Sequence, residues 1–246
     1  MELQIVGCWA PYPRTGEACN GYLVKAGQTT CLLDCGHGVM SCLGKYIDPL
    51  EINLVMISHF HPDHYVDLYA LRHLFRAARY QGKKVGPVDL FIPEHPQEQY
   101  QYWQAVPEFT VYPIHPSARV ALSGLNIEFY PASHPLPSYS LKFWTGNASL
   151  YYSSDTSARE EMWEQAEGAD ILLGEASLLA QDGELAYELG HMTTEQLARG
   201  ALKARPGLLI ATHLWPGFDS TILMQEIQSI YTGPAVLAYA GFSISI

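Results

Sequence analysis

Short apolar runs alternate along this chain with longer segments whose apolar residues recur at helical spacing. Apolar runs bounded by glycine, proline or polar residues are typical of buried strands. They predict strands at residues 3–8, 21–26, 29–34, 52–57, 88–92, 110–112, 118–122, 125–130, 139–145, 149–153, 171–173, 208–211 and 235–240. The segments between them predict helices at 39–46, 65–81, 94–106, 160–167, 195–203 and 221–230. No linker rich in glycine, serine or charge interrupts the pattern, so we expect one domain over residues 1–246.

The helix predicted at 65–81 illustrates how the spacing assigns faces. Its apolar positions are Val66, Tyr69, Ala70, His73, Leu74 and Ala77. We expect this set to face the core, with His73 packed or half-exposed rather than a metal ligand. Arg72, Arg76 and Arg79 share another face of the same helix, and we interpret them as a solvated face rather than a binding patch. For the helix at 195–203, Thr193 or Thr194 is the expected N-cap.

Composition narrows the class of protein. No apolar segment of the 246 residues is long enough to span a bilayer. The first residues lack a basic region followed by an apolar stretch, so a cytoplasmic location is the default expectation. The net charge of −11 argues against a broad nucleic-acid surface. The five cysteines form no Cys-x-x-Cys pair, and an odd number without a secretion signal predicts buried free thiols.

The candidate chemistry is concentrated in His59-Phe60-His61-Pro62-Asp63-His64. This segment lies between the apolar run 52–57 and the next predicted helix, and sheet proteins commonly place their sites at such strand ends. His59 and His61 are two residues apart, so in an extended loop they point the same way and can bind one metal. Asp63 and His64 follow the Pro62 turn and point elsewhere, where they can reach a second metal. Imidazole and carboxylate groups suit Zn²⁺, with Mn²⁺ or Fe²⁺ also allowed.

The pattern His-x-His-x-Asp-His is the signature of the metallo-β-lactamase superfamily, and residues 59–64 resemble it without departure. Leu32-Leu33-Asp34-Cys35-Gly36 resembles the first motif of that family, whose aspartate supports the metal site from behind the ligands. For Asp34 taken alone, a turn-forming aspartate before glycine is the alternative. The resemblance implies an α/β fold of the αββα sandwich type, in which two mixed β-sheets pack face to face and helices cover the outer faces.

Three further candidate ligands, His134, Asp155 and His213, each come just after a predicted strand. They occupy the same structural position as the first cluster, which gives seven candidates from four loops. The arrangement is similar to the dinuclear sites of the superfamily. That similarity assigns one metal to His59, His61 and His134, the other to Asp63, His64 and His213, and a bridging position to Asp155. A hydroxide held between the two divalent ions would attack the substrate, and Asp63 could also orient it or accept its proton.

Two segments resemble the ribonuclease Z and phosphodiesterase branch of the superfamily. Gly174-Glu175-Ala176-Ser177 is similar to its His-Glu-Ala-Thr motif, and Gly190-His191-Met192-Thr193 to its His-x-Thr motif. The resemblance implies that His191, oriented by Glu175, contacts the scissile phosphate and protonates the leaving oxygen. The alternative is that Glu175 only ends a strand and His191 only starts a helix. The tRNA-binding arm of that branch has no counterpart in the short hairpin between His134 and Asp155, so a small or nucleotide-type phosphodiester is expected instead of tRNA.

Several alternatives stay open. The same metals could hydrolyse a lactone, a thioester or another carboxylic ester, and a non-catalytic metal-binding protein on this fold is a third interpretation. A redox di-iron protein is disfavoured, because such proteins of this superfamily usually carry an acidic residue at the position that His61 occupies in this chain. Phe60, Tyr65, Tyr139, Trp215 and Phe218 flank the motifs and could form an aromatic wall for an organic group. No membrane partner is expected, His37 is a candidate for the pocket lining, and the sequence is compatible with a homodimer.

Overall fold

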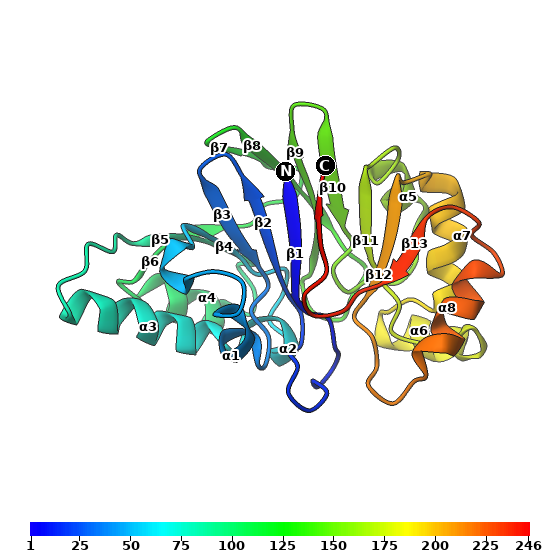
Figure 1. Ribbon diagram of the computed structural model, residues 1–246, viewed down its shortest axis with the longest axis horizontal. Coiled ribbons are helices and arrows are strands. Elements are labelled where there is room, and N and C mark those ends of the chain that lie inside the picture. Colours follow the sequence, from blue (N-terminus) through cyan, green and yellow to red (C-terminus); the bar gives the residue numbers. More distant parts are fainter.

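The computed structural model describes residues 1–246 as two seven-stranded sheets packed face to face, with helices on both outer sides (Figure 1). In spatial order, the first sheet contains β14 (Ser243–Ser245), β1 (Glu2–Gly7), β2 (Gly21–Ala26), β3 (Thr29–Leu33), β4 (Leu54–Met56), β5 (Val88–Ile92) and β6 (Phe109–Pro113). The second contains β13 (Ala235–Leu237), β12 (Leu208–Thr212), β11 (Ile171–Glu175), β10 (Ala148–Tyr152), β9 (Tyr139–Thr145), β8 (Leu125–Pro131) and β7 (Arg119–Leu122). The αββα expectation is confirmed.

Helices from the first half of the chain lie on one outer side of the sandwich, and helices from the second half lie on the other (Figure 1). On the first side are η1 (Pro49–Glu51), α1 (Val39–Leu43), α2 (Pro62–Tyr65), α3 (Leu68–Tyr80) and α4 (Gln97–Gln104). On the second are η2 (Ala180–Asp182), α5 (Glu160–Gln165), α6 (Gly183–Leu189), α7 (Thr194–Ala204) and α8 (Ser220–Gln228). The sequence pattern did not predict α6 or β14.

Alternating side chains in the strands bury both faces of the first sheet. In β4, Leu54 and Met56 belong to the core between the sheets, whereas Val55 packs with the outer helices. Because side chains alternate with a period of two, a strand covered on both faces is apolar throughout. This explains why the buried strands appear in the sequence as uninterrupted apolar runs.

The two sheets share one plan that brings their loops to the same edge. β3, β4, β5 and β6 are parallel, as are β10, β11, β12 and β13, and each parallel set continues into antiparallel strands. β8 runs in the same direction as β10 because both pair antiparallel with β9. The carboxyl ends of β8, β10, β11 and β12 therefore lie at one edge, where open sheets place their sites.

The helix expected at 65–81 is instead two helices. α2 begins at Pro62, and α3 begins at Leu68 after the chain turns at Val66–Asp67. The predicted core face was therefore wrong. The buried residues of α3 are Leu68, Leu71, Phe75 and Ala78, and His73 is exposed. The apolar periodicity starts afresh after the turn, which a single helix of constant phase could not represent.

The arginines of α3 have a structural role. Arg72 and Arg76 contact the carboxylate of Glu108 at 3.4 Å and 2.9 Å, and Glu108 is buried. A buried carboxylate is costly unless cations or hydrogen-bond donors compensate it. These arginines therefore hold the chain between α4 and β6 against α3, rather than forming the solvated face that we expected.

Other local expectations are confirmed. Thr193 caps α7 in a capping box with Gln196. All five cysteines are buried free thiols. As a separate observation, no helix in the structure combines the length and the apolar character that a bilayer span requires.

Candidate metal centre

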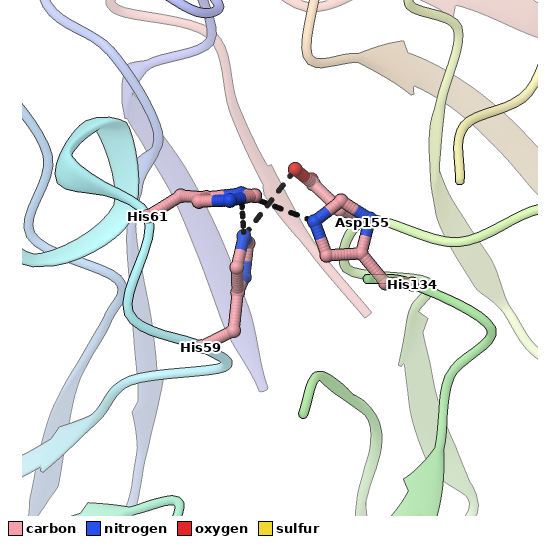
Figure 2. Close-up of side chains that lie close together, drawn as sticks. All are labelled: His59, His61, His134 and Asp155. Atoms are coloured by element: carbon pink, nitrogen blue, oxygen red, sulfur yellow. Dashed lines mark hydrogen bonds and ion pairs between the residues drawn. The ribbon is translucent and has the colours of Figure 1, made fainter. Parts of the chain in front are cut away.

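A first group of possible metal ligands lies where the two halves of the molecule meet. His59 and His61 come from the loop after β4, His134 from the loop after β8 and Asp155 from the loop after β10, and their side chains converge (Figure 2). The Nδ1 atom of His61 lies 3.1 Å from His59 Nε2 and 3.0 Å from His134 Nε2. Asp155 Oδ2 is 3.5 Å from His59 Nε2. Three imidazoles and a carboxylate directed at one point can bind a metal ion.

A second group, Asp63, His64 and His213, lies beside the first. Asp63 Oδ2 is 3.7 Å from His64 Nε2 and 3.4 Å from His213 Nε2. Asp155 stands between the two groups, with Oδ1 3.3 Å from His64 Nε2 and Oδ2 3.0 Å from His213 Nε2. The structure thus brings all seven sequence-predicted candidates together, and Asp155 contacts histidines of both groups.

Hydrogen bonds fix the orientation of four of these imidazoles. In each, Nδ1 faces an oxygen atom of the surrounding protein, so Nε2 is the ring nitrogen directed toward the other candidate ligands. The Nε2 atom of His64 also lies 3.1 Å from the side-chain amide nitrogen of Asn20. The partners are Ser58 Oγ for His59 at 3.1 Å, Asp34 Oδ2 for His64 at 2.8 Å, the Gly190 carbonyl for His134 at 2.9 Å and Ser177 Oγ for His213 at 2.7 Å. Metal-binding histidines in proteins are commonly held in this way.

Asp34 organises the floor beneath the second group. Its Oδ1 accepts the backbone N–H of Ser58 at 2.7 Å. Its Oδ2 accepts from the Ser58 hydroxyl at 2.9 Å, from His64 Nδ1 at 2.8 Å and from the Tyr152 hydroxyl at 2.8 Å. Asp34 is also fully buried, so these donors compensate its charge. It therefore links the β4 loop to the second sheet.

Two buried tyrosines connect the sheets below the ligands. Tyr152 on β10 reaches across to Asp34 on the first sheet, and Tyr22 on β2 reaches across to Thr212, the residue before His213. The hydroxyl oxygens of Tyr22 and Thr212 are 2.7 Å apart. The ring centres of Tyr22 and Tyr152 are 5.3 Å apart. Each sheet thus holds a ligand-bearing loop of the other. Local residue patterns do not indicate these contacts, because Tyr152 and Asp34 are 118 positions apart in the chain.

The donor atoms at the centre fit a metal better than they fit one another. Asp155 Oδ1 and His213 Nε2 are buried and have no hydrogen-bond partner of acceptable geometry. The two residues are nevertheless close, with Asp155 Oδ2 3.0 Å from His213 Nε2. Unpartnered buried polar atoms are costly, and native proteins rarely tolerate them. A divalent ion between the groups would satisfy them.

The pKa values of the imidazoles differ between the two groups. Burial, and then the neighbouring imidazoles, lower the pKa values of His59, His61 and His134. A lowered pKa favours the neutral form of the imidazole, which is the form that binds metals. Burial also opposes protonation of His213, but Asp155 and Asp63 outweigh it and raise its pKa to about 10. The carboxylates therefore demand positive charge near His213, which a divalent ion would supply in place of a proton.

The backbone around the ligands is unusual. Asp34, Ser154 and His213 have φ values of 56°, 53° and 57°, in the left-handed region that non-glycine residues seldom occupy. Such conformations cluster at functional sites, where the surrounding structure enforces them. Gly36 has a related role: a Cβ atom there would lie 1.8 Å from the carbonyl oxygen of Asp63. The close approach of these two loops requires the glycine of the first motif.

Glu175 and His191 form a pair beside the two groups. His191 Nδ1 is 3.2 Å and 3.3 Å from the Glu175 carboxylate oxygens and 4.0 Å from Asp155 Oδ2. Burial lowers the pKa of His191, but Glu175 and then Asp155 outweigh it, so the pKa is raised. The His191 side chain is 17% exposed, against 1% for Glu175. The histidine is thus accessible from the cavity and the carboxylate supports it from behind.

Ser177 and Gly174 explain two details of the surrounding motif. The Ser177 hydroxyl donates to Glu175 and lies next to His213 Nδ1, so it connects the pair to the second group. Gly174 stands where the related motif has histidine. A Cβ atom at Gly174 would lie 2.4 Å from Cδ1 of Leu197, a buried residue of α7. A larger side chain at this position would therefore require Leu197 of α7 to shift.

The groups open into a cavity of about 530 Å³. His37 lines it, as the sequence allowed, whereas His95 and His115 are exposed elsewhere. Of the five aromatic residues that were candidates for a wall, Trp215 is the one that lines the cavity. Phe60 is instead buried in the core under α3. Flanking a motif in sequence does not place a side chain in the cavity, because neighbours in a loop point in different directions.

Comparison with known proteins agrees with this geometry. Residues 29–214 match the family described as the β-lactamase superfamily domain. The chain belongs to the metallo-β-lactamase superfamily. It is 28% identical to the protein of Bacillus subtilis named "Probable metallo-hydrolase YhfI" over 98% of both chains. It is 24% identical to a ribonuclease Z of Gloeothece citriformis over all of this chain and 96% of that protein.

Solved structures extend the comparison. The crystal structure of Bacillus subtilis YhfI superposes with a TM-score of 0.95 over 99% of this chain and 98% of YhfI, at 26% identity. Human tRNase Z, short form, has a TM-score of 0.80 at 19% identity, covering 100% and 99% of the two chains. The latter likeness concerns the fold. Family membership and the relatives together make this chain a metal-dependent hydrolase with ribonuclease Z-like relatives.

Replacing Tyr152 by phenylalanine tests the contact between the sheets. Tyr152→Phe removes one donor from the buried Asp34 carboxylate, and we expect the free energy of unfolding to fall by about 1–3 kcal/mol. Tyr151→Phe is the matched control, because its hydroxyl donates to the half-buried amide of Gln165 at 3.0 Å. The control should lose less than about 1 kcal/mol in urea unfolding. Equal losses in the two variants would contradict the role given to Tyr152.

Proposed function

We propose that this protein hydrolyses a small or nucleotide-type phosphodiester at a centre of two divalent metal ions, with Zn²⁺ favoured over Mn²⁺ or Fe²⁺. His59, His61 and His134 would hold one ion, Asp63, His64 and His213 the other, and Asp155 would lie between them. Bound divalent ions would lower the pKa of water and neutralise charge on the ester oxygens. The observation that carries the phosphodiester assignment is the Glu175–His191 pair beside both groups.

The pair supplies what the metals do not. Hydrolysis of a phosphodiester expels an alkoxide or phenoxide, which must gain a proton. His191 is held at Nδ1 by Glu175 and lines the cavity, and its raised pKa keeps a proton available near neutral pH. Glu175 is itself fixed by the backbone N–H of Thr156 at 2.6 Å and of Met192 at 3.3 Å. The carboxylate thus positions the histidine, and the histidine donates to the leaving oxygen.

The surroundings of the site support a small substrate. His134 and Asp155 are separated only by the loop 132–138 and the β9–β10 hairpin, so no inserted arm extends from this edge. The net charge of −11 also opposes tight binding to a phosphate backbone. We therefore propose a small-molecule ester rather than tRNA as the substrate.

A substrate screen tests the reaction class. Metal-replete protein should hydrolyse bis-p-nitrophenyl phosphate and should prefer it to a panel of lactones. Asp155→Ala should lose at least about a hundredfold in kcat/KM, because both groups depend on this carboxylate. His95→Ala, at an exposed histidine outside the cavity, should retain full activity. Hydrolysis of lactones without measurable phosphodiester turnover would overturn the assignment in favour of a carboxylic ester hydrolase.

The acid role of His191 predicts a dependence on the leaving group. We expect His191→Gln to slow hydrolysis of the phenyl ester of thymidine 5′-phosphate by about 10²–10⁴-fold. p-Nitrophenoxide leaves more readily without a proton, so hydrolysis of the p-nitrophenyl ester should slow by less than about tenfold. His73→Gln, at an exposed position of α3, serves as the control. An equal loss on both esters would mean that His191 binds or positions the substrate and does not protonate it.

A further inference from the structure

Part of the cavity wall is apolar. Its apolar members come from four segments that are distant in sequence: Ala10, Pro11, Pro62, Leu178, Leu189 and Trp215. Leu189 is the last residue of α6, and Trp215 follows the β12 loop that carries His213. Apolar surface that remains open beside a polar centre is typical of a ligand pocket. A molecule in the cavity can therefore contact both the candidate ligand groups and apolar side chains.

No lysine or arginine lines this cavity. Arg14 belongs to the same N-terminal loop as Pro11, but its guanidinium is committed elsewhere. It donates to the carbonyls of Pro216 and Phe218 at 3.1–3.3 Å and lies 3.9 Å from the centre of the Trp9 ring. Arginine and lysine side chains are the usual charged partners of phosphate groups in proteins. This cavity has no such cation beyond the metal centre.

Trp215 is presented to the cavity on a supported loop. The carbonyl groups that Arg14 binds belong to residues directly after Trp215, and the Phe218 ring lies 5.4 Å from the Trp215 ring. Even so, 37% of Trp215 is exposed. A large aromatic side chain held in place with its surface free is suited to stacking against a flat ligand group. His37 is the only ionisable lining residue outside the ligand groups and the Glu175–His191 pair.

We infer that the cavity selects phosphodiesters that carry one negative charge and an uncharged aromatic group, which stacks on Trp215 and contacts Leu189. The inference rests on the proposed function and narrows its substrate class. The phosphoryl group would lie over the ligand groups, and the aromatic group would lie against the apolar wall. Diesters with a second phosphate would place that charge against carbon atoms without a compensating cation, which is costly.

Binding of two phosphinates tests the aromatic contact without turnover. Diphenylphosphinate and dimethylphosphinate are both monoanions with no ester bond to break. On metal-loaded protein, calorimetry should give a dissociation constant at least about tenfold lower for the diphenyl compound. Trp215→Ala should abolish most of this difference, and Trp215→Phe should restore most of it. Tyr187→Ala removes an exposed aromatic side chain outside the cavity and should change nothing. Equal binding of the two phosphinates, or an unchanged preference in Trp215→Ala, would overturn the inference.

A second comparison tests the charge limit. The p-nitrophenyl ester of thymidine 5′-phosphate and the same ester with an added 3′-phosphate differ only in that phosphate group and its charge. The added phosphate should weaken displacement of diphenylphosphinate by about tenfold or more. Tighter binding of the 3′-phosphate compound would contradict the inference. Because displacement needs no catalysis, absence of phosphodiester turnover would sink the proposed function while leaving this inference to be judged by binding.

Discussion

The buried carboxylate of Asp155 is the group on which the arrangement of this site depends. It lies within 3.5 Å of imidazole nitrogens from His59, His64 and His213, which belong to opposite halves of the molecule. A buried carboxylate that is not neutralised costs several kcal/mol. The structure meets this cost with inward-facing imidazoles, and the remaining unpartnered atoms indicate that a divalent ion completes the compensation. Both sheets must therefore be in register for the centre to exist.

That register is maintained below the ligands by polar contacts in an apolar core. Tyr22 on the first sheet contacts Thr212 at the end of a strand of the second sheet, and Tyr152 on the second sheet donates to Asp34 of the first. Asp34 thus accepts hydrogen bonds from both sides, because it also accepts the backbone N–H of Ser58. Such contacts are worth little in net stability when satisfied, yet leaving one unmade is costly. Their main effect is therefore to oppose sliding of one sheet over the other, and their net contribution to the free energy of unfolding is small. The fold positions the ligands through these contacts, and the apolar core supplies the driving force for packing.

Much of the fold and of the candidate site could be predicted from residue patterns. Strands buried on both faces appear as apolar runs, and a strand end followed by histidine or aspartate marked each ligand loop. The pattern did not indicate α6, whose Leu185, Tyr187 and Leu189 are exposed rather than packed. It also misplaced the buried face of α3, because a turn at Val66–Asp67 changed the helical phase. Contacts made by Tyr22, Tyr152 and Ser177 depend on tertiary packing, for which local sequence carries no period.

The site has three parts: the two groups of candidate ligands, a histidine supported by Glu175, and an apolar part of the cavity wall. We propose that the seven converging side chains hold two ions, one on each side of Asp155. The most direct measurement is an anomalous-difference map from crystals of the purified protein. The account predicts two metal peaks, one among His59, His61 and His134 and the other among Asp63, His64 and His213, with Asp155 between them. A single peak, or none in metal-replete crystals, would contradict it.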